Sequence, residues 1–242
     1  MPAAASSCSS SDGPPLRQSG PVVVVSPHLD DAVFSCGGLL QAHPGSVVIT
    51  VYTGVPDASD ISTDWDRRCG FSNASQAMEH RLAEERLALS LVGSRGKGLG
   101  FIDSQYGGGE DEDLPNLAER LLHALSSLAA ERVAIPLGLC HGDHVRVSDA
   151  ALKVREACPG ISWFFYEDVP YRYRSGAVQE RLAQLRARGI AATPARLETD
   201  FSGKAEAVSV YASQLRGLGG SPGDDESSER YWRVAASVRP LA

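Results

Sequence analysis

Short apolar runs alternate with longer amphipathic segments along most of this chain. The runs are rich in β-branched or aromatic residues, as buried parallel strands are, and several are bounded by Gly or Pro. The expected strands are Val22–Val25, Val47–Thr53, Leu99–Ile102, Arg132–Pro136 and Ile161–Tyr166. The expected helices are Asp31–Ala42, His80–Val92, Leu114–Ala129 and Val145–Cys158. This alternation predicts an α/β fold, a Rossmann-like doubly wound, mostly parallel sheet with helices on both faces.

Two connections are placed to shape a pocket. Gly54–Glu79 is longer than an ordinary strand-to-helix loop and carries Trp65, and we interpret it as a lid. Glu167–Tyr173 offers aromatic faces that suit a sugar ring, although packing as a surface loop explains it equally well. Gly37 and Gly38 would permit the first helix to pack closely on the sheet.

Composition indicates a single enzyme-sized domain. Residues 1–20 are rich in Ser, Ala, Pro and Gly and lack the apolar stretch of a signal peptide, so we expect a disordered tail followed by one domain over 21–242. No run approaches the roughly 18 apolar residues of a membrane span. The net charge of −7 and the lack of a basic run argue against a nucleic-acid partner. Five cysteines without CxxC spacing favour reduced thiols in the cytoplasm, and homo-oligomerisation stays open.

Two clusters of polar side chains directly follow two expected strands. Ser26–Gly38, which reads SPHLDDAVFSCGG, joins the first strand to the first helix, and His141–His144, which reads HGDH, follows the apolar run Val133–Leu139. Open α/β sheets place their ligands at the carboxyl ends of their strands. Two strands of one sheet can therefore bring these imidazoles and carboxylates together.

The residue types in the clusters suit a divalent transition metal. Catalytic zinc sites use about three protein ligands and keep a position for water, and His28, Asp31 and His144 would make such a set. Side chains of neighbouring residues diverge in a turn, so Asp30 stays free to act as a base. His141 is a candidate proton donor or oxyanion partner. The alternative interpretation is that Asp30 only caps the following helix and that the histidines are structural.

The two clusters resemble the motifs of the PIG-L/LmbE-like family of metal-dependent de-N-acetylases, which usually read His-Pro-Asp-Asp-Glu and His-Pro-Asp-His. Weaker matches extend the resemblance over residues 21–215 and comprise Arg81, Leu82, Ala83, Glu84, Ala88, Gly93, Lys204, Ala207, Ser213 and Gln214. The resemblance implies zinc or another divalent transition metal on His28, Asp31 and His144, with Asp30 as general base, His141 as acid or oxyanion stabiliser, Asp143 as hydrogen-bond partner of an imidazole, and Arg81 as sugar ligand. A surface ion pair with Glu84 or Glu85 on the same helix accounts for Arg81 equally well.

The chain also departs from the family pattern at four positions. Leu29 and Gly142 replace the two prolines, and Ala32 replaces the glutamate of the first motif. Tyr211 stands where many relatives carry histidine. The missing glutamate puts in question any contact through which it would orient His28 or the metal.

Together with this chemistry, the resemblance implies a zinc-dependent hydrolase that removes an N-acyl group, in the simplest case N-acetyl, from a small amino sugar or glycoconjugate. An amidase acting on a larger N-acyl conjugate would use the same residues. A phosphoesterase would need more metal ligands and often two metals. A non-catalytic α/β binding module would bind no metal at these histidines.

Overall fold

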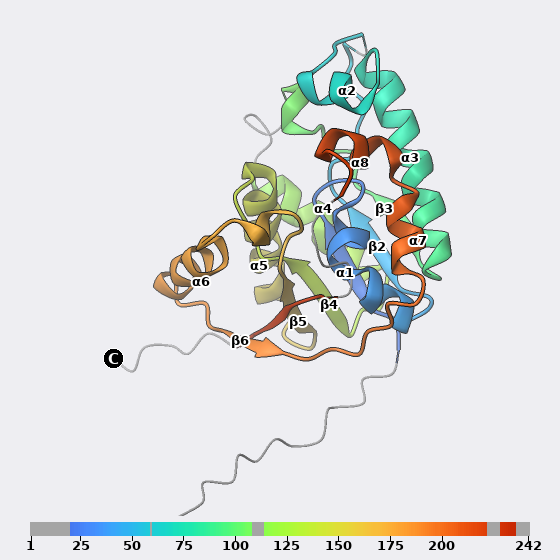
Figure 1. Ribbon diagram of the computed structural model, residues 1–242. Helices are drawn as coiled ribbons and strands as arrows, with labels where there is room; N and C mark the ends of the chain where they lie inside the picture. Colours follow the sequence, from blue (N-terminus) through green and yellow to red (C-terminus); the bar gives the residue numbers. More distant parts are fainter. Residues whose placement is uncertain (1–19, 59, 108–113, 222–227, 236–242) are drawn as a thin grey trace, which may run out of the picture.

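One sheet organises the chain. The computed structural model describes residues 20–58, 60–107, 114–221 and 228–235, and within them the strand order is β3-β2-β1-β4-β5-β7-β6. The strands are β1 (Val23–Ser26), β2 (Val47–Thr50), β3 (Arg95–Gly98), β4 (Arg132–Pro136), β5 (Ser162–Tyr166), β6 (Ala192–Ala195) and β7 (Tyr231–Val234). The first five run parallel, whereas β7 is antiparallel to both β5 and β6. The predicted mostly parallel α/β sheet is confirmed (Figure 1).

Helices cover both faces of the sheet, as predicted. They are α1 (Asp31–Ala42), α2 (Asp64–Cys69), α3 (Ala74–Leu91), α4 (Leu114–Ser126), α5 (Gly142–Ala157), α6 (Ala177–Ala187), α7 (Lys204–Ser209) and α8 (Ala212–Leu218), with short 3-10 helices at Ser104–Tyr106 and Tyr171–Tyr173. Apolar side chains of α4, α5 and α6 pack on one face of the sheet. Those of α1, α3 and α7 pack on the other. None of the helices in the described ranges has the length and apolar character that crossing a membrane requires.

The central position of β1 determines where a ligand can bind. Val23 and Val25 contribute to the core on one face, and Val22 and Val24 to the core on the other, so the strand is buried from both sides. It lies between β2 and β4, where the strand order changes direction. Such a switch point leaves a crevice outside the carboxyl ends of the strands. Residues that follow β1 and β4 therefore lie at the same crevice.

Several expected elements are confirmed, and others differ at their ends. Helix α1 and strand β4 have the predicted bounds. Strand β2 stops at Thr50 rather than Thr53, and α4 ends at Ser126 rather than Ala129. Helix α3 begins at Ala74 rather than His80, because the side chain of Asn73 accepts the N–H of the third helical residue at 2.9 Å. This polar cap extends the helix into the segment expected to be a loop.

The prediction of a strand at Leu99–Ile102 is wrong. The edge strand β3 precedes it, and its sequence of Arg, Gly, Lys and Gly is mostly exposed and gives no apolar signal. The following Leu99 and Phe101 are buried, and their N–H groups donate to the carbonyls of Thr50 and Val51. Their burial comes from an extended segment after the strand.

The two glycines of α1 pack against the C-terminal segment rather than on the sheet. A Cβ on Gly37 would lie 2.9 Å from Cγ of Lys204, and one on Gly38 would lie 2.6 Å from the Phe201 ring. The backbone of α1 leaves helical geometry at Cys36. The carboxylate of Glu229 accepts the N–H of Gly38 at 2.7 Å beside this kink. The glycines thus allow α1 to approach the first residue of α7 and the segment before it.

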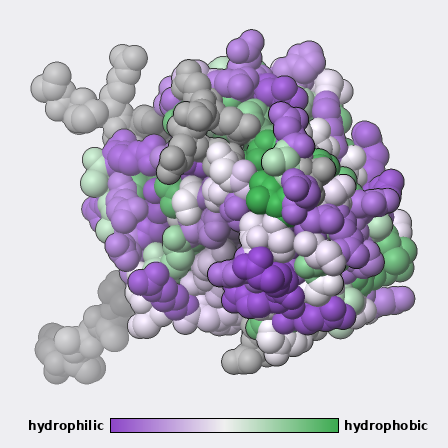
Figure 2. All heavy atoms as spheres, turned by 90° about the horizontal axis from the view of Figure 1, so that it is seen from above, coloured by the Kyte–Doolittle hydropathy of each residue, from purple (hydrophilic) through white to green (hydrophobic). Residues whose placement is uncertain are grey.

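The remaining expectations concern the chain ends and the long connection. The tail expected over residues 1–20 lies outside the described residues, apart from Gly20. The connection 54–79 contains α2 and the first part of α3, and the C-terminal residues that resemble the family, from Lys204 to Gln214, lie on two short helices, α7 and α8. Helix α2 begins with a reciprocal capping pair between Thr63 and Asp66 and packs on α8. The face seen from above in Figure 2 is mostly polar, with apolar residues in small areas.

Candidate active site

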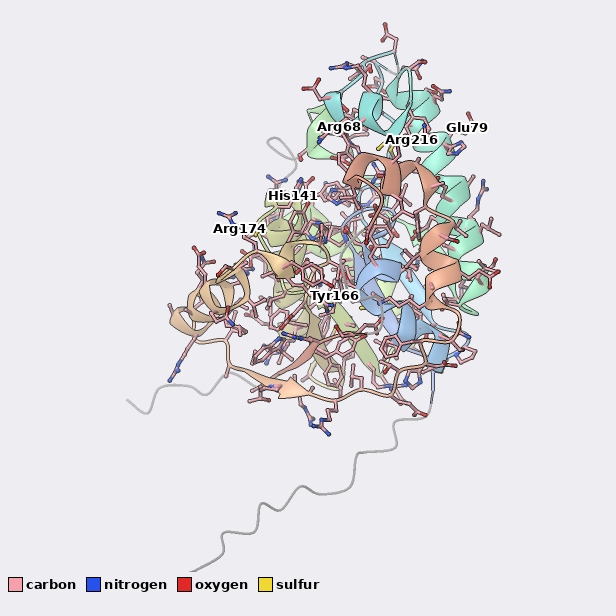
Figure 3. The ribbon with its side chains drawn as sticks, in the orientation of Figure 1. Arg68, Glu79, His141, Tyr166, Arg174 and Arg216 are labelled. Atoms are coloured by element: carbon pink, nitrogen blue, oxygen red, sulfur yellow. The ribbon has the colours of Figure 1, made fainter. Side chains whose placement is uncertain are left out.

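Three of the predicted residues meet at the carboxyl ends of β1 and β4. Nδ1 of His28 and Nε2 of His144 each lie 3.2 Å from the same carboxylate oxygen of Asp31. One ligand atom from each residue lies within 4.8 Å of the other two, and all three side chains are buried. His141 lies on the same side of the molecule as Arg68 of α2 (Figure 3).

This donor set fits a divalent transition metal. Tetrahedral ligands at zinc distances of about 2.0–2.1 Å lie roughly 3.3 Å from one another, which is close to the separations between Asp31 and the two imidazoles. A second trio of His28, His141 and Asp143 also has ligand atoms within 4.8 Å, but it shares His28 and includes a less buried imidazole. The trio with His144 is therefore the better-formed candidate.

A carboxylate holds the outer ring nitrogen of each candidate histidine ligand. Nε2 of His28 lies 3.1 Å from Oδ2 of Asp143, and Nδ1 of His144 lies 2.6 Å from Oδ1 of Asp168. Both carboxylates are almost fully buried. Contacts of this kind fix the tautomer and the orientation of a metal-binding imidazole. The structure thus identifies His28 as the imidazole that Asp143 contacts.

Sequence reasoning missed Asp168. It comes shortly after β5, in the segment 167–173 that was singled out for its aromatic faces. Its side chain also accepts the N–H of Gly138 at 2.9 Å, which ties the loop after β4 to the loop after β5. A carboxylate directly after a strand was the available signal, but it becomes specific only once β5 is known to lie next to β4.

The carboxylates around the imidazoles favour positive charge at the site. Burial opposes protonation of His144, but Asp31 and Asp168 outweigh it and raise its pKa to about 9. Burial also opposes the charge of Asp31, yet contact with His144 and His28 lowers its pKa. Protons on the imidazoles or a divalent cation can supply this positive charge, so the electrostatics agree with the donor set.

Asp30 stands apart from this trio. Its φ of 126° lies where residues other than glycine are rare, and its side chain makes no capping hydrogen bond to α1. The alternative that Asp30 merely caps the helix is therefore wrong. Its carboxyl group lines the pocket, and burial together with the negative charge of Asp31 raises its pKa well above the usual value. A raised pKa suits a group that must accept a proton.

His141 offers one ring nitrogen to the pocket. It is the N-cap of α5, and its Nδ1 accepts the N–H of Asp143 at 3.2 Å. The neutral imidazole therefore carries its proton on Nε2. Burial, and then the positive charges of His28 and His144, lower its pKa. The arrangement favours a neutral N–H donor at the pocket wall.

Arg81 points into the pocket rather than pairing on the helix surface. It is only 4% exposed, and the alternative pairing with Glu84 or Glu85 is wrong, because those carboxylates accept hydrogen bonds from the start of α8. Its nearest described acidic partner is Asp103, at 3.6 Å from Nη1, and its Nε has no hydrogen bond within the described residues. A buried guanidinium with unfilled donors is suited to oxygen atoms of a ligand. Sequence reasoning also missed Asp103.

The departures from the family motifs are accommodated by packing. Leu29 lies in a small apolar cluster beside α3, and Ala32 is fully buried in the core under α1. No carboxylate therefore approaches the trio from position 32. Tyr211 is buried, and its hydroxyl donates to Glu85 at 2.5 Å. A Cβ on Gly142 would meet nothing within 4 Å.

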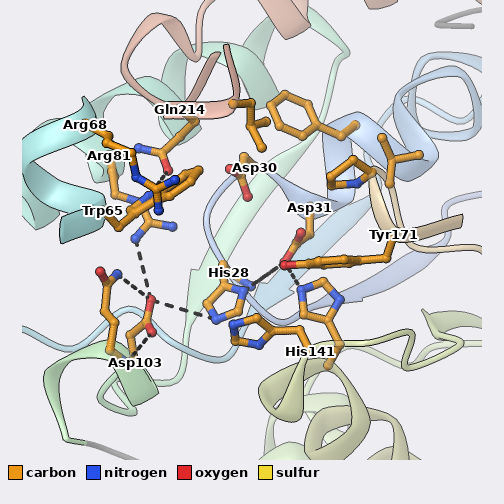
Figure 4. Close-up of a pocket in the computed structure, with 16 residues that line it drawn as sticks. His28, Asp30, Asp31, Trp65, Arg68, Arg81, Asp103, His141, Tyr171 and Gln214 are labelled. Carbon is orange, nitrogen blue, oxygen red and sulfur yellow. Dashed lines mark hydrogen bonds and ion pairs between the residues drawn. The ribbon is translucent and has the colours of Figure 1, made fainter. Parts of the chain in front are cut away.

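The site lies in a pocket of about 380 Å³. Its walls come from elements far apart in the sequence: Trp65 and Arg68 of α2, Gln214 and Leu218 of α8, and Val169, Pro170 and Tyr171 of the loop after β5. Figure 4 shows Trp65, Arg68 and Gln214 on one wall and Tyr171 across from them. Both connections expected to shape a pocket do line it.

Comparisons with known proteins agree with these features. The PIG-L family, described as GlcNAc-PI de-N-acetylase, matches residues 23–155. The 2'-N-acetylparomamine deacetylase of Streptomyces fradiae is 32% identical over 241 residues, which cover 91% of this chain and 80% of that protein. Two solved structures, a triple mutant of a deacetylase in teicoplanin biosynthesis and the zinc-inhibited form of the teicoplanin deacetylase Orf2, superpose with TM-scores of 0.75 and 0.74. Each is 23% identical, covering 89% of this chain and 98% of the other, and shows a common fold.

Proposed function

The chain belongs to the PIG-L family of metal-dependent de-N-acetylases, and on this premise we propose that it removes the N-acetyl group from an amino sugar or a glycoconjugate. The observation that carries the proposal is the buried trio of His28, Asp31 and His144 beside the free carboxyl group of Asp30 in one pocket. The relative named for 2'-N-acetylparomamine supports an amino-sugar acceptor.

His28, Asp31 and His144 would hold the metal, and zinc or another divalent transition metal fits their nitrogen and oxygen donors. When bound, such an ion would polarise the acyl carbonyl and lower the pKa of water in the site. Asp143 and Asp168 keep the imidazoles of His28 and His144 oriented, because each carboxylate contacts the ring nitrogen that would not bind the metal. We therefore assign these two carboxylates a positioning role.

Asp30 would transfer the protons of the reaction, and His141 would donate a hydrogen bond to the developing negative charge. Asp30 removes a proton from the water whose oxygen attacks the acyl carbon, and the Nε2–H of His141 donates a hydrogen bond to the carbonyl oxygen as it becomes negative. The C–N bond then breaks, and Asp30 returns its proton to the departing nitrogen. The products are acetate and a free amino sugar.

Arg81 and Asp103 would bind the sugar ring. Their polar atoms lie 3.6 Å apart, both are buried, and both line the pocket. A guanidinium donates to hydroxyl oxygens and a carboxylate accepts from hydroxyl groups, so this pair can hold two neighbouring hydroxyls. The rings of Tyr171 and Trp65 add flat apolar walls.

Replacement of Asp30 by Asn tests the proposal. Loss of a general base commonly costs about 10² to 10⁴ in turnover, whereas the metal ligands are untouched. We expect acetate release from N-acetylglucosamine glycosides to fall by that factor, with metal content by plasma mass spectrometry equal to wild type. The control variant His144→Ala should lose the metal as well. Full turnover in Asp30→Asn would remove Asp30 from its role, and phosphate release from a generic ester would favour a phosphoesterase.

Three further expectations belong to this proposal. Residues 21–242 form a single deacetylase domain, since one sheet draws its strands from Val23 to Val234. The enzyme works in the cytoplasm, where thiols stay reduced, and its four described cysteines are free. Its partners are small N-acyl amino sugars or glycoconjugates rather than nucleic acid or membranes.

A further inference from the structure

The wall of the pocket formed by α2 and α8 presents a flat aromatic platform. Nε1 of Trp65 donates to Oε1 of Gln214 at 3.1 Å, which fixes the ring across the two helices. A Cβ on Gly217 would lie 3.0 Å from the ring, so α8 approaches it closely. The guanidinium carbon of Arg68 lies 5.0 Å from the ring centroid. A guanidinium stacked on an aromatic face keeps the N–H groups at its edge available.

The two neighbouring arginines of α2 have different surroundings. The guanidinium of Arg67 pairs with Asp64 and also donates to the backbone carbonyl of Ser62 at 2.9 Å. Arg68 forms no ion pair with any described carboxylate, is exposed, and lines the pocket, whereas Arg67 does not line it. Arg67 therefore provides a matched control for Arg68, because it has the same charge on the same helix outside the pocket.

The other basic groups of the pocket have acidic partners. Arg81 faces Asp103, and Asp31 lies between the two candidate histidine ligands. Among the described basic side chains that line the pocket, Arg68 alone has no described carboxylate within ion-pair distance. A ligand that fills the pocket therefore meets, at the α2 wall, a positive charge that no described carboxylate pairs with. An ammonium group there would be repelled, and an anion would be attracted.

We propose that Arg68, stacked on Trp65, selects acceptors that carry an anionic substituent, a carboxylate or a phosphate group, on the part of the sugar that faces α2. The inference rests on the proposed function and specifies the substrate class for the same pocket. The anion accepts the edge N–H groups of the guanidinium in charge-assisted hydrogen bonds. Because Arg68 is exposed, solvent weakens the effect, and we expect a preference of about fivefold over a neutral substituent.

A series of N-acetylglucosamine β-glycosides tests this inference. The aglycones are 2-hydroxyethyl, carboxymethyl and 2-aminoethyl, which are neutral, anionic and cationic at similar size, and N-acetylglucosamine 1-phosphate separates phosphate from carboxylate. Wild type should show kcat/KM about fivefold higher for carboxymethyl than for hydroxyethyl, and lower for aminoethyl. In Arg68→Gln the ratio of carboxymethyl to hydroxyethyl should fall to about one, whereas Arg67→Gln should keep the wild-type ratio.

Calorimetric binding of the same glycosides separates this inference from the proposed function. If no glycoside is deacetylated but carboxymethyl still binds about fivefold more tightly than hydroxyethyl in wild type and not in Arg68→Gln, the proposed reaction fails and the selection by Arg68 stands. If all glycosides are turned over with equal kcat/KM and bind equally, the reaction stands and the selection by Arg68 is refuted. An equal loss for all three aglycones in Arg68→Gln would also refute it, because that pattern indicates a structural role of the side chain.

Discussion

Replacement of Asp168 by Asn should weaken metal binding without unfolding the protein. Asp168 lies behind His144, with 2.6 Å between its Oδ1 and Nδ1 of the ring, and both side chains are about 1% exposed. The amide of Asn has nearly the same shape, and its oxygen can still accept the ring N–H, but it carries no charge and its NH2 group cannot accept the N–H of Gly138 that Oδ2 accepts in wild type. The substitution therefore removes the negative charge behind the imidazole and one backbone hydrogen bond, and it leaves the size of the side chain nearly unchanged.

The expected loss follows from this geometry. A carboxylate behind a metal-binding imidazole makes the ring a stronger ligand, and loss of such a partner typically costs about 10-fold to 100-fold in metal affinity. That range corresponds to about 1.4 to 2.7 kcal/mol of binding free energy. The short contact and the complete burial of Asp168 place our expectation at the upper end. A smaller loss is expected for Asp143→Asn, because its contact with His28 is longer at 3.1 Å.

Competition with a chromophoric chelator at neutral pH measures the zinc dissociation constant of each variant. Asp149→Asn is the matched control, since this carboxylate pairs with Arg181 and Arg188 away from the two rings. It should bind zinc as wild type does. Equal zinc affinity in Asp168→Asn and wild type would refute the reasoning, because the carboxylate would then contribute nothing to the ligand it contacts.

Two further predictions concern stability. Burial outweighs the hydrogen bonds from Tyr211 and Thr50 and raises the pKa of Glu85 from 4.5 to about 7, so the folded state binds more protons and wild type loses stability as pH rises between these values. By linkage, Glu85→Gln should gain up to about 3 kcal/mol of unfolding free energy relative to wild type between pH 4 and pH 8, measured by urea unfolding. A difference in unfolding free energy that does not change with pH would contradict this prediction. Gly38→Ala should destabilise by about 1 to 3 kcal/mol, since the new Cβ would lie 2.6 Å from the Phe201 ring. The control for Gly38→Ala in thermal unfolding is Gly160→Ala, because a Cβ on Gly160 would meet nothing within 4 Å. Equal melting temperatures of the two variants would contradict the packing argument.

The sequence predicted those parts of the fold in which local pattern and burial agree. Strand β4 and helix α1 have the predicted bounds because their apolar residues pack on the central strands. Strand β3 was missed because an edge strand of Arg, Gly, Lys and Gly is stabilised by backbone pairing with β2 rather than by apolar burial. The beginning of α3 was missed because a cap, and not an amphipathic stripe, determines it.

The residues of the candidate site also fall into those that the sequence alone marks and those that only the fold identifies. His28, Asp30 and Asp31 occur within four residues, and His141, Asp143 and His144 likewise, so their spacing alone marks them. Asp103 and Asp168 are single carboxylates in separate loops, and acidic residues are common in loops. They become specific only through the strand order, which brings the ends of β3 and β5 to the crevice beside β1 and β4.

The distribution of these residues has a physical reason. The expected ligand His28 comes from the turn after β1 and Asp31 from the first position of α1, and the carboxylates that hold the outer nitrogens come from α5 and from the loop after β5. Because ligand and support lie on different elements, the relative position of two strand ends determines the orientation of each ring. Substitutions that shift β5 against β4 should therefore affect the His144 ring through Asp168, even though they touch neither the motifs nor the pocket. The short motifs specify which atoms bind the metal, whereas the sheet specifies how firmly those atoms are held.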